Sequence, residues 1–301
     1  MLAVTVSEFN NQLVIGVITG AVYGLVALGL VLIYKSSRVF NFAQAEFGTV
    51  ATYALFWALN TPELPYGLAL VLALLCAVAM GLAVERLIVR PLFDAPRVTL
   101  LVATAGVALL AIGIEFWQTN EQLVRPIPPI SQETQRVEVL GIFISDQRLV
   151  ILAVLVALAV GLALFFNRTH LGLAVLAASQ EPTATELMGI SVRRISALTW
   201  GLAALLGGIA GVLYGPVQGS FSPGYLSLKS GLLIPAFTAA VIGGMTSLPG
   251  AFTGGIIVGI TQAMAELSTF NEVVGAPAVF VFGLLLAVLL VRPQGLLGKA
   301  A

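Results

Sequence analysis

Three polar side chains next to the start of an apolar run are the first candidates for chemistry. Asn41, Gln44 and Glu46 open the run 42–59. Such groups are costly in hydrocarbon unless they face protein, water or a cavity. Two interpretations stay open: they line or brace a translocation path, or they lie at the membrane interface and are solvated. On a helix, Gln44 and Glu46 point about 200° apart and cannot face one site unless the helix is broken.

Further polar residues interrupt other apolar runs. Tyr23 and Gln262 lie within such runs, and we expect them beside the same translocation path as Asn41, Gln44 and Glu46. By contrast, two acidic residues lie near the ends of their runs, where a charge reaches water cheaply. We therefore expect Glu115 and Glu266 at the interface.

The sequence indicates neither a metal site nor an active site. His170 has no second His or Cys at metal-ligand spacing and is expected to be solvated. Cys76 stands alone in an apolar run and is expected to be a small buried side chain. Nucleotide-loop, nucleophile-elbow, zinc and dinucleotide motifs are missing, so we predict no catalytic residue and no cofactor in this chain. If ATP drives the protein, another chain must bind it.

The composition places the chain in lipid. Of its 301 residues, 59% are hydrophobic and 9% are charged, whereas a soluble domain is about 25% charged. The 31 glycines fit close helix packing in a membrane. The 14 basic and 14 acidic residues balance, which argues against a nucleic-acid-binding surface.

Apolar runs predict about nine membrane-spanning helices, since a crossing needs about 20 mainly apolar residues. Six runs are strong and three are weaker, and the last weak pair is expected to be short or re-entrant. The strong runs are 13–34, 66–84, 98–117, 149–166, 195–215 and 275–291, and the weaker ones are 42–59, 228–245 and 249–267. The predicted fold is an all-α polytopic membrane bundle.

Loop charge predicts the orientation, because Lys and Arg gather in cytoplasmic loops. With the N-terminus outside and the C-terminus inside, ten of the 14 basic residues lie inside. Only Arg125, Arg136, Arg148 and Lys229 remain outside. The charge asymmetry therefore favours nine spans with this orientation.

Two loops stand out in a chain that we interpret as one transmembrane domain, residues 1–301. The outer loop 118–147 carries Pro126, Pro128 and Pro129 and then alternating residues, which predicts a short external cap with a hairpin. The inner loop 167–194 contains the segment 180–188, with Pro182 near its start, and this predicts a short cytoplasmic helix.

Six segments in order along the chain resemble the permease subunits of bacterial branched-chain amino acid ABC importers, specifically the smaller of their two permeases. The superfamily also includes urea and ribose-type permeases. One of the segments reads Asn-Phe-Ala-Gln-Ala-Glu, where the family usually has Asn-Phe-Ala-His-Gly-Glu. The segments are 24–30, 41–48, 186–191, 210–215, 237–251 and 292–298.

The resemblance implies a multi-pass protein of the bacterial cytoplasmic membrane that works in a complex. Its partners would be a second homologous permease, two cytoplasmic ATPases that bind ATP and magnesium, and an external substrate-binding protein. The inner loop would dock on the ATPase. The residues that this implies for coupling are Glu181, Glu186, Gly189, Arg193 and Arg194.

The substrate stays open at this point. Branched-chain amino acids are the expectation, but Gln44 and Ala45 replace the usual His and Gly, and urea or short-chain amides are the alternative. A different class of protein, a proton-coupled secondary transporter, would use Glu46 as its protonation site. Homodimer and heterodimer are likewise both open.

Overall fold

The computed structural model describes residues 6–60, 64–93, 95–119, 124–127, 136–139, 142–229, 231–267 and 275–298. Within these residues the chain is almost wholly helical, as predicted. The helices are α1 (Val6–Ser37), α2 (Gln44–Asn60), α3 (Tyr66–Val84), α4 (Arg97–Thr119), α5 (Asp146–Arg168), α6 (His170–Gln180), α7 (Pro182–Leu187), α8 (Val192–Gln218), α9 (Leu233–Gly243), α10 (Leu248–Ala265) and α11 (Ala276–Val291), with two π-turns, η1 (Glu85–Val89) and η2 (Tyr225–Lys229).

Six helical segments in the described part of the chain are long and apolar enough to cross a membrane. They are Glu8–Ser37, Tyr66–Val89, Arg97–Thr119, Gln147–Arg168, Val192–Gln218 and Leu248–Ala265. Two further apolar helices, α9 and α11, are shorter. The run 249–267, predicted as weak, thus forms a helix that is long and apolar enough to cross, while the run 275–291, predicted as strong, forms the shorter helix α11.

The predicted span 228–245 is not one continuous helix. Its first part is the π-turn η2, and α9 begins only at Leu233. Gly231 lies between them with φ of 58°, a left-handed conformation that interrupts a right-handed helix. The 11 residues of α9 extend about 16 Å, about half of the hydrocarbon thickness. The expectation of a short or re-entrant pair therefore holds for its first member.

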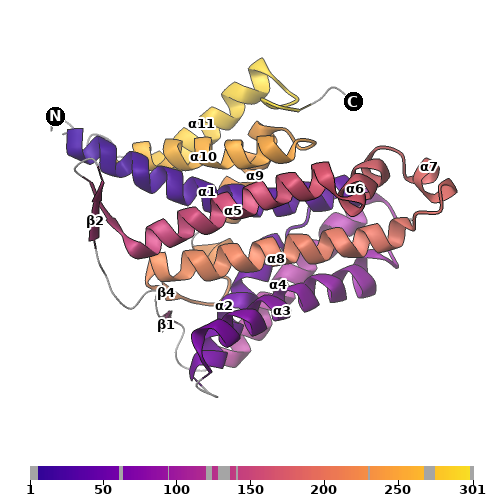
Figure 1. The fold of residues 1–301 in the computed structure, drawn as a ribbon, viewed down its shortest axis with the longest axis horizontal. Coiled ribbons are helices and arrows are strands. Elements are labelled where there is room, and N and C mark those ends of the chain that lie inside the picture. The colour runs from indigo at the N-terminus through magenta and orange to yellow at the C-terminus, as the bar shows by residue number, and fades with distance from the viewer. Residues whose placement is uncertain are drawn as a thin grey trace. The chain divides into compact units, whose positions relative to one another are not determined.

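The Cα positions divide the chain into two compact units, described separately here. The second unit comprises 29–128 and 160–233, and its centre is the packed trio of α2, α3 and α8 (Figure 1). Glycines permit this packing: a Cβ on Gly48 would lie 2.6 Å from the carbonyl oxygen of Gly207, and Gly211 lies against the backbone of Gly48. These contacts are an instance of the close helix packing that the glycine content predicts.

The first unit comprises 1–28, 129–159 and 234–301, and a glycine ladder joins α1 to α10. A Cβ on Gly20 would lie 2.7 Å from the carbonyl oxygen of Gly255, and Gly259 also lies against the backbone of Gly20. Small residues four apart let two membrane helices approach in this way. In the same unit, the amides of Leu296 and Leu297 donate to the last carbonyls of α9 at 2.7 and 3.2 Å, so two of the six resemblance segments meet there.

Two pairs of short strands lie in and beyond the predicted external cap. β2 (Arg136–Val139) and β3 (Ile142–Ser145) pair antiparallel, which confirms the predicted hairpin. β1 (Arg125–Pro126) pairs with β4 (Ser220–Phe221), just after α8 ends. Residues 120–123, 128–135, 140 and 141 of this loop, and Lys299, lie outside the described residues.

The predicted buried Cys76 is exposed instead. It lies on the face of α3 that carries Leu72 and Leu75, which are 45% and 57% exposed. An apolar run does not reveal which face of its helix packs on protein and which faces lipid. For Cys76, the sequence therefore predicted the span but not the face.

Candidate translocation pathway and coupling loop

The predicted pathway residues Tyr23 and Gln262 meet in the first unit. The Tyr23 hydroxyl donates to Gln262 Oε1 at 2.9 Å, and Tyr23 is buried. Since the two residues are 239 positions apart, this bond fixes α1 to α10. It lies beside the glycine ladder that brings the helices together.

Asn41 and Gln44 are buried in the second unit and are not solvated at an interface. Asn41 Oδ1 accepts from the Ala43 amide at 3.0 Å and so caps the turn that leads into α2. Gln44 Nε2 donates 2.9 Å to the carbonyl oxygen of Ala203 on α8. Gln44 therefore holds two helices together in this conformation.

Glu46 points elsewhere, as its angular offset from Gln44 predicts. It is fully buried, and Ser227 Oγ of η2 donates to its Oε1. Glu115 of α4 is also buried, and its Oε2 accepts from the Gly224 amide at 2.7 Å. Both carboxyl groups are thus bonded to the same turn, at Gly224 and Ser227, and Ser227 Oγ also lies 3.3 Å from the Gly224 carbonyl oxygen.

The expectation that Glu115 reaches water at the end of its helix is therefore wrong. The residues around Gly224 fold back onto α4 and cover its carboxyl group, a contact between positions 109 residues apart. No local pattern reports such a contact. Glu266, by contrast, is exposed, as predicted.

Tyr225 of η2 adds a second buried contact between this turn and the helices. Its hydroxyl donates to the carbonyl oxygen of Gly211 on α8 at 2.6 Å and lies 3.3 Å from the hydroxyl of Thr52 on α2. The π-turn is thus held by Gly224, Tyr225 and Ser227 to three different helices. Sequence analysis missed this turn, although the Ser-Pro-Gly run at 222–224 indicates a break in helix.

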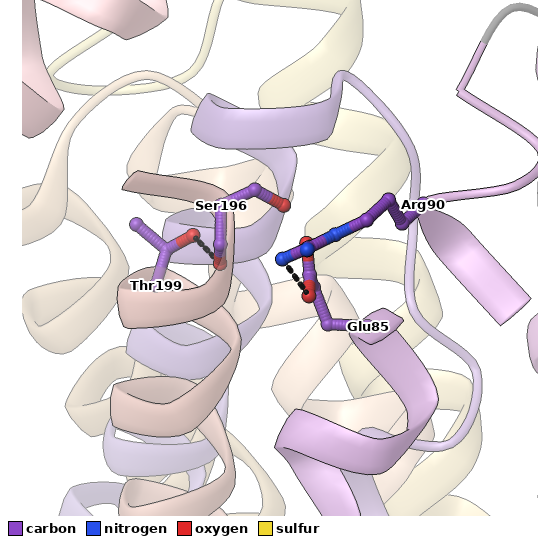
Figure 2. Close-up of polar contacts among 4 residues, drawn as sticks. All are labelled: Glu85, Arg90, Ser196 and Thr199. Atoms are coloured by element: carbon purple, nitrogen blue, oxygen red, sulfur yellow. Dashed lines mark hydrogen bonds and ion pairs between the residues drawn. The ribbon is translucent and has the colours of Figure 1, made fainter. Parts of the chain in front are cut away.

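A third buried carboxylate lies near the start of α8. Glu85 forms an ion pair with Arg90, with 2.9 Å between Oε2 and Nη2. The backbone bond of the π-turn η1, from the Arg90 amide to the Glu85 carbonyl at 2.8 Å, brings the two side chains together. Figure 2 shows the pair beside Ser196 and Thr199 of α8. This pair, too, was missed by sequence analysis.

The inner loop has the predicted short helix and a further helix, α6. α7 begins at Pro182, as expected, and Gly189 after it has φ of 81°, a left-handed turn that ends the helix. All five coupling candidates, Glu181, Glu186, Gly189, Arg193 and Arg194, are exposed. Leu187 and Met188 at the end of α7 are 84% and 82% exposed. His170 at the start of α6 is also exposed, as predicted.

These features define a multi-pass helical membrane protein whose buried polar residues join helices and whose loop between α6 and α8 is exposed. In the described residues, no group of three or more His, Cys, Asp or Glu side chains is placed to hold a metal ion. The chain belongs to the family described as "Branched-chain amino acid transport system / permease component", whose model matches residues 12–291. It is therefore a permease component of a transport system.

The curated relatives agree over nearly the whole chain. The high-affinity branched-chain amino acid permease BraD of Pseudomonas aeruginosa is 32% identical, over 97% of this chain and 96% of the relative. LivH of Escherichia coli K12, a permease of the same description, is 31% identical over 97% of this chain and 96% of LivH. LivM of the same organism is 29% identical over 50% of this chain and 35% of LivM. The resemblance to the smaller permease is confirmed.

Proposed function

We propose that this chain is the membrane-spanning permease subunit of an ATP-driven importer that moves branched-chain amino acids into the cell. The observation that carries the proposal is the match to BraD and LivH over 97% of this chain. Since the chain also matches half its length to LivM, a permease of the same organism as one LivH, we propose a second, homologous permease as its partner. Two ATPases with ATP and magnesium, and an external binding protein, complete the complex.

The exposed inner loop supports docking of an ATPase. A short helix, α7, ends at a left-handed glycine and presents two large apolar side chains, Leu187 and Met188, to solvent. Their exposure, with Glu186 and Arg193 beside them, fits a mixed apolar and charged interface. The loop continues directly into α8, so a movement of the ATPase would be passed to a helix buried in the unit.

The replaced motif residues bear on the alternative substrate. Gln44 is engaged with Ala203, and Ala45 is 1% exposed. Both side chains therefore serve helix packing in this conformation, and the departure from the usual His-Gly gives little reason to prefer urea or an amide. Tyr23, Gln262, Asn41, Gln44 and Glu46 stay our candidates for residues that line or brace the path.

Reconstitution of the whole complex tests the proposal. Proteoliposomes that contain both permeases and the ATPases, with the binding protein outside and ATP inside, should accumulate radiolabelled leucine, isoleucine and valine. Uptake should stop with vanadate and continue when a protonophore collapses the proton gradient. The matched control carries a Walker A lysine replacement in the ATPase.

The competing outcomes are distinct. Accumulation of urea or acetamide in place of leucine would transfer the proposal to the alternative substrate class. Uptake without ATP that collapses with the proton gradient would contradict an ATP-driven importer and support the secondary transporter.

A further inference from the structure

We infer that Glu46 and Glu115 form a proton-binding site, in which the two carboxyl groups share one proton inside the membrane-spanning part of the second unit. This inference is independent of which solute the complex moves. It rests on the atoms that each carboxyl group uses and on those that it leaves without a partner.

Each carboxyl group has one oxygen satisfied and one left over. Glu46 Oε1 accepts from Ser227, and Glu115 Oε2 accepts from the Gly224 amide. Glu46 Oε2 and Glu115 Oε1 are buried without a hydrogen-bond partner. An ionised carboxylate only accepts hydrogen bonds, so two of them cannot satisfy each other. A single proton between the two groups gives one of them a donor and the other a charge-assisted bond.

Protein cations do not neutralise this pair. Among the described side chains, neither carboxylate forms an ion pair with Lys or Arg. Arg125 of β1 directs its guanidinium to the carbonyl oxygen of Thr119, at 3.4 Å, and to the Phe56 ring, at 5.1 Å. Two buried carboxylates without a counter-charge would cost far more free energy than one, because burial and mutual repulsion both oppose the second charge.

The titratable side chains described on the elements around the pair include four uncharged phenols, Tyr53 on α2, Tyr66 on α3, Tyr214 on α8 and Tyr225 on η2, and Glu85 of η1, which is paired with Arg90. Arg97 of α4 and Arg193 and Arg194 of α8 lie at the opposite ends of their helices from Glu115 and Gly211. Lys229 ends η2, and its side chain lies outside the described side chains. Among the described groups the pair therefore has no counter-charge, and a proton would neutralise it.

Two hydroxyl groups on the same face of α2 support a site at which the proton comes and goes. Thr49 and Tyr53 follow Glu46 at i+3 and i+7 and so lie on its helical face. Thr49 is fully buried and Tyr53 is 7% exposed, and neither hydroxyl has a hydrogen-bond partner. Such free donors would stabilise the pair when its proton leaves.

The shared proton would also fix the turn η2. Glu46 holds Ser227 and Glu115 holds Gly224, and a proton shared by the two carboxyl groups would add a bond between α2 and α4. Loss of the proton would place two like charges in this joint and separate the helices from the turn. The site would thus make the closed arrangement of η2 depend on proton occupancy.

Infrared spectroscopy of the complete complex tests the proton directly. In lipid nanodiscs at neutral pD, the wild type should show the carbonyl stretch of one protonated carboxylic acid. Glu46→Gln and Glu115→Gln should each remove this band, because the new amide donates to the remaining carboxylate. Glu266→Gln, at an exposed acid, is the matched control and should keep the band.

Three outcomes would overturn the inference. The first is a wild-type spectrum without a carboxylic-acid band, and the second is a band that survives in both Glu46→Gln and Glu115→Gln. The third is a band that appears only when sodium is withheld, which would show that a metal cation occupies the site in place of the proton. Since the spectrum requires no transport, failure of leucine uptake with an intact band would count against the proposed function alone. As a second readout, Glu115→Gln should flatten the pH dependence of uptake relative to the wild type.

Discussion

The two ends of α8 neutralise buried acid in different ways. Near its start, Glu85 pairs with Arg90 from the same π-turn, beside Ser196 (Figure 2). Near its end, the turn η2 that is bonded to Gly211 also holds Glu46 and Glu115, which come from two separate helices and have no arginine or lysine as a described ion-pair partner. Glu85 is neutralised by an arginine of the same π-turn, whereas Glu46 and Glu115 would be neutralised by a proton that they share.

This difference separates a permanent joint from a conditional one. Arg90 keeps its charge at any physiological pH, so the Glu85 pair stays neutralised throughout a transport cycle. A carboxyl pair from two helices loses its bond when either helix moves or when its proton leaves. The start of α8 is therefore suited to transmit force from the exposed loop, and the end is suited to respond to it.

The largest expected effect comes from removal of the fixed counter-charge. Arg90→Leu leaves Glu85 buried at 2% exposure without its partner. Breaking a buried pair by removing one member costs about 3 kcal/mol or more. We expect a clear fall in the melting temperature of the purified permease in detergent, measured by thermal shift.

The control for this variant removes both charges. Glu85→Leu combined with Arg90→Leu should recover most of the lost stability, because no uncompensated charge remains. By comparison, Glu46→Gln should cost much less than Arg90→Leu, because it introduces a neutral amide and no unpaired charge. Equal losses of thermal stability in Arg90→Leu and Glu46→Gln would contradict the proposed difference between the fixed ion pair and the carboxyl pair.

The next largest effect is expected at the backbone contact between Gly211 of α8 and Gly48 of α2. A Cβ on Gly211 would overlap the backbone of Gly48, whereas a Cβ on Gly106 of α4 meets nothing within 4 Å. Gly211→Ala should destabilise the protein by about 2 kcal/mol through overpacking. Gly106→Ala should be neutral or stabilise by up to about 1 kcal/mol through helix propensity. Thermal shift of both variants checks this, and similar values for the two would be inconsistent with the packing described.

Sequence reasoning succeeded where the relevant signal is local or periodic. Apolar runs located the long helices, the glycine content indicated close helix packing, and Pro182 marked the start of the short helix α7. It failed where a residue's environment is made by a distant segment. Glu115 was placed at an interface because nothing near it in sequence shows that Gly224, 109 positions away, covers it.

The candidate site was predictable to a similar extent. Polar residues in apolar runs identified Gln44 and Glu46, and angular spacing correctly separated their directions. Their partners, Ala203 and Ser227, could not be named, since helix pairing is decided by tertiary packing. The face of α3 that carries Cys76 was missed for the same reason.

A smaller structural effect with a functional consequence is expected at the loop that leads into α8. Gly189 has φ of 81° and no atom within 4 Å of a built Cβ, so Gly189→Val strains the turn without a clash. The strain is about 1–2 kcal/mol. We expect the permease to stay folded in the membrane while co-purification of the ATPase and leucine uptake fall together.

Charge reversal on the same loop gives an independent variant. Glu186→Lys alters the exposed docking surface and leaves the turn unstrained. Gly106→Ala serves as the matched glycine control and should leave ATPase binding unchanged. An intact complex and normal uptake in both loop variants would show that the ATPase binds elsewhere. The start of α8 would then not transmit force from this loop.

The last prediction carries no expected loss of stability and tests whether the two ends of α8 lie on opposite sides of the membrane. The 27 residues of α8 extend about 40 Å, enough to cross a bilayer. Val124 adjoins β1, which pairs with β4 just beyond the end of α8, and Met188 precedes its start; they are 53% and 82% exposed. In a Cys76→Ser background, Val124→Cys should react with an impermeant maleimide added outside intact cells. Met188→Cys should react only after the membrane is opened, because the predicted excess of basic residues places the inner loop in the cytoplasm. Uptake of leucine by each cysteine variant should match that of the background protein, which shows that the labelled molecules are the transporting ones. Labelling of both positions from one side would remove the distinction between an outer, conditional end of α8 and an inner, fixed one.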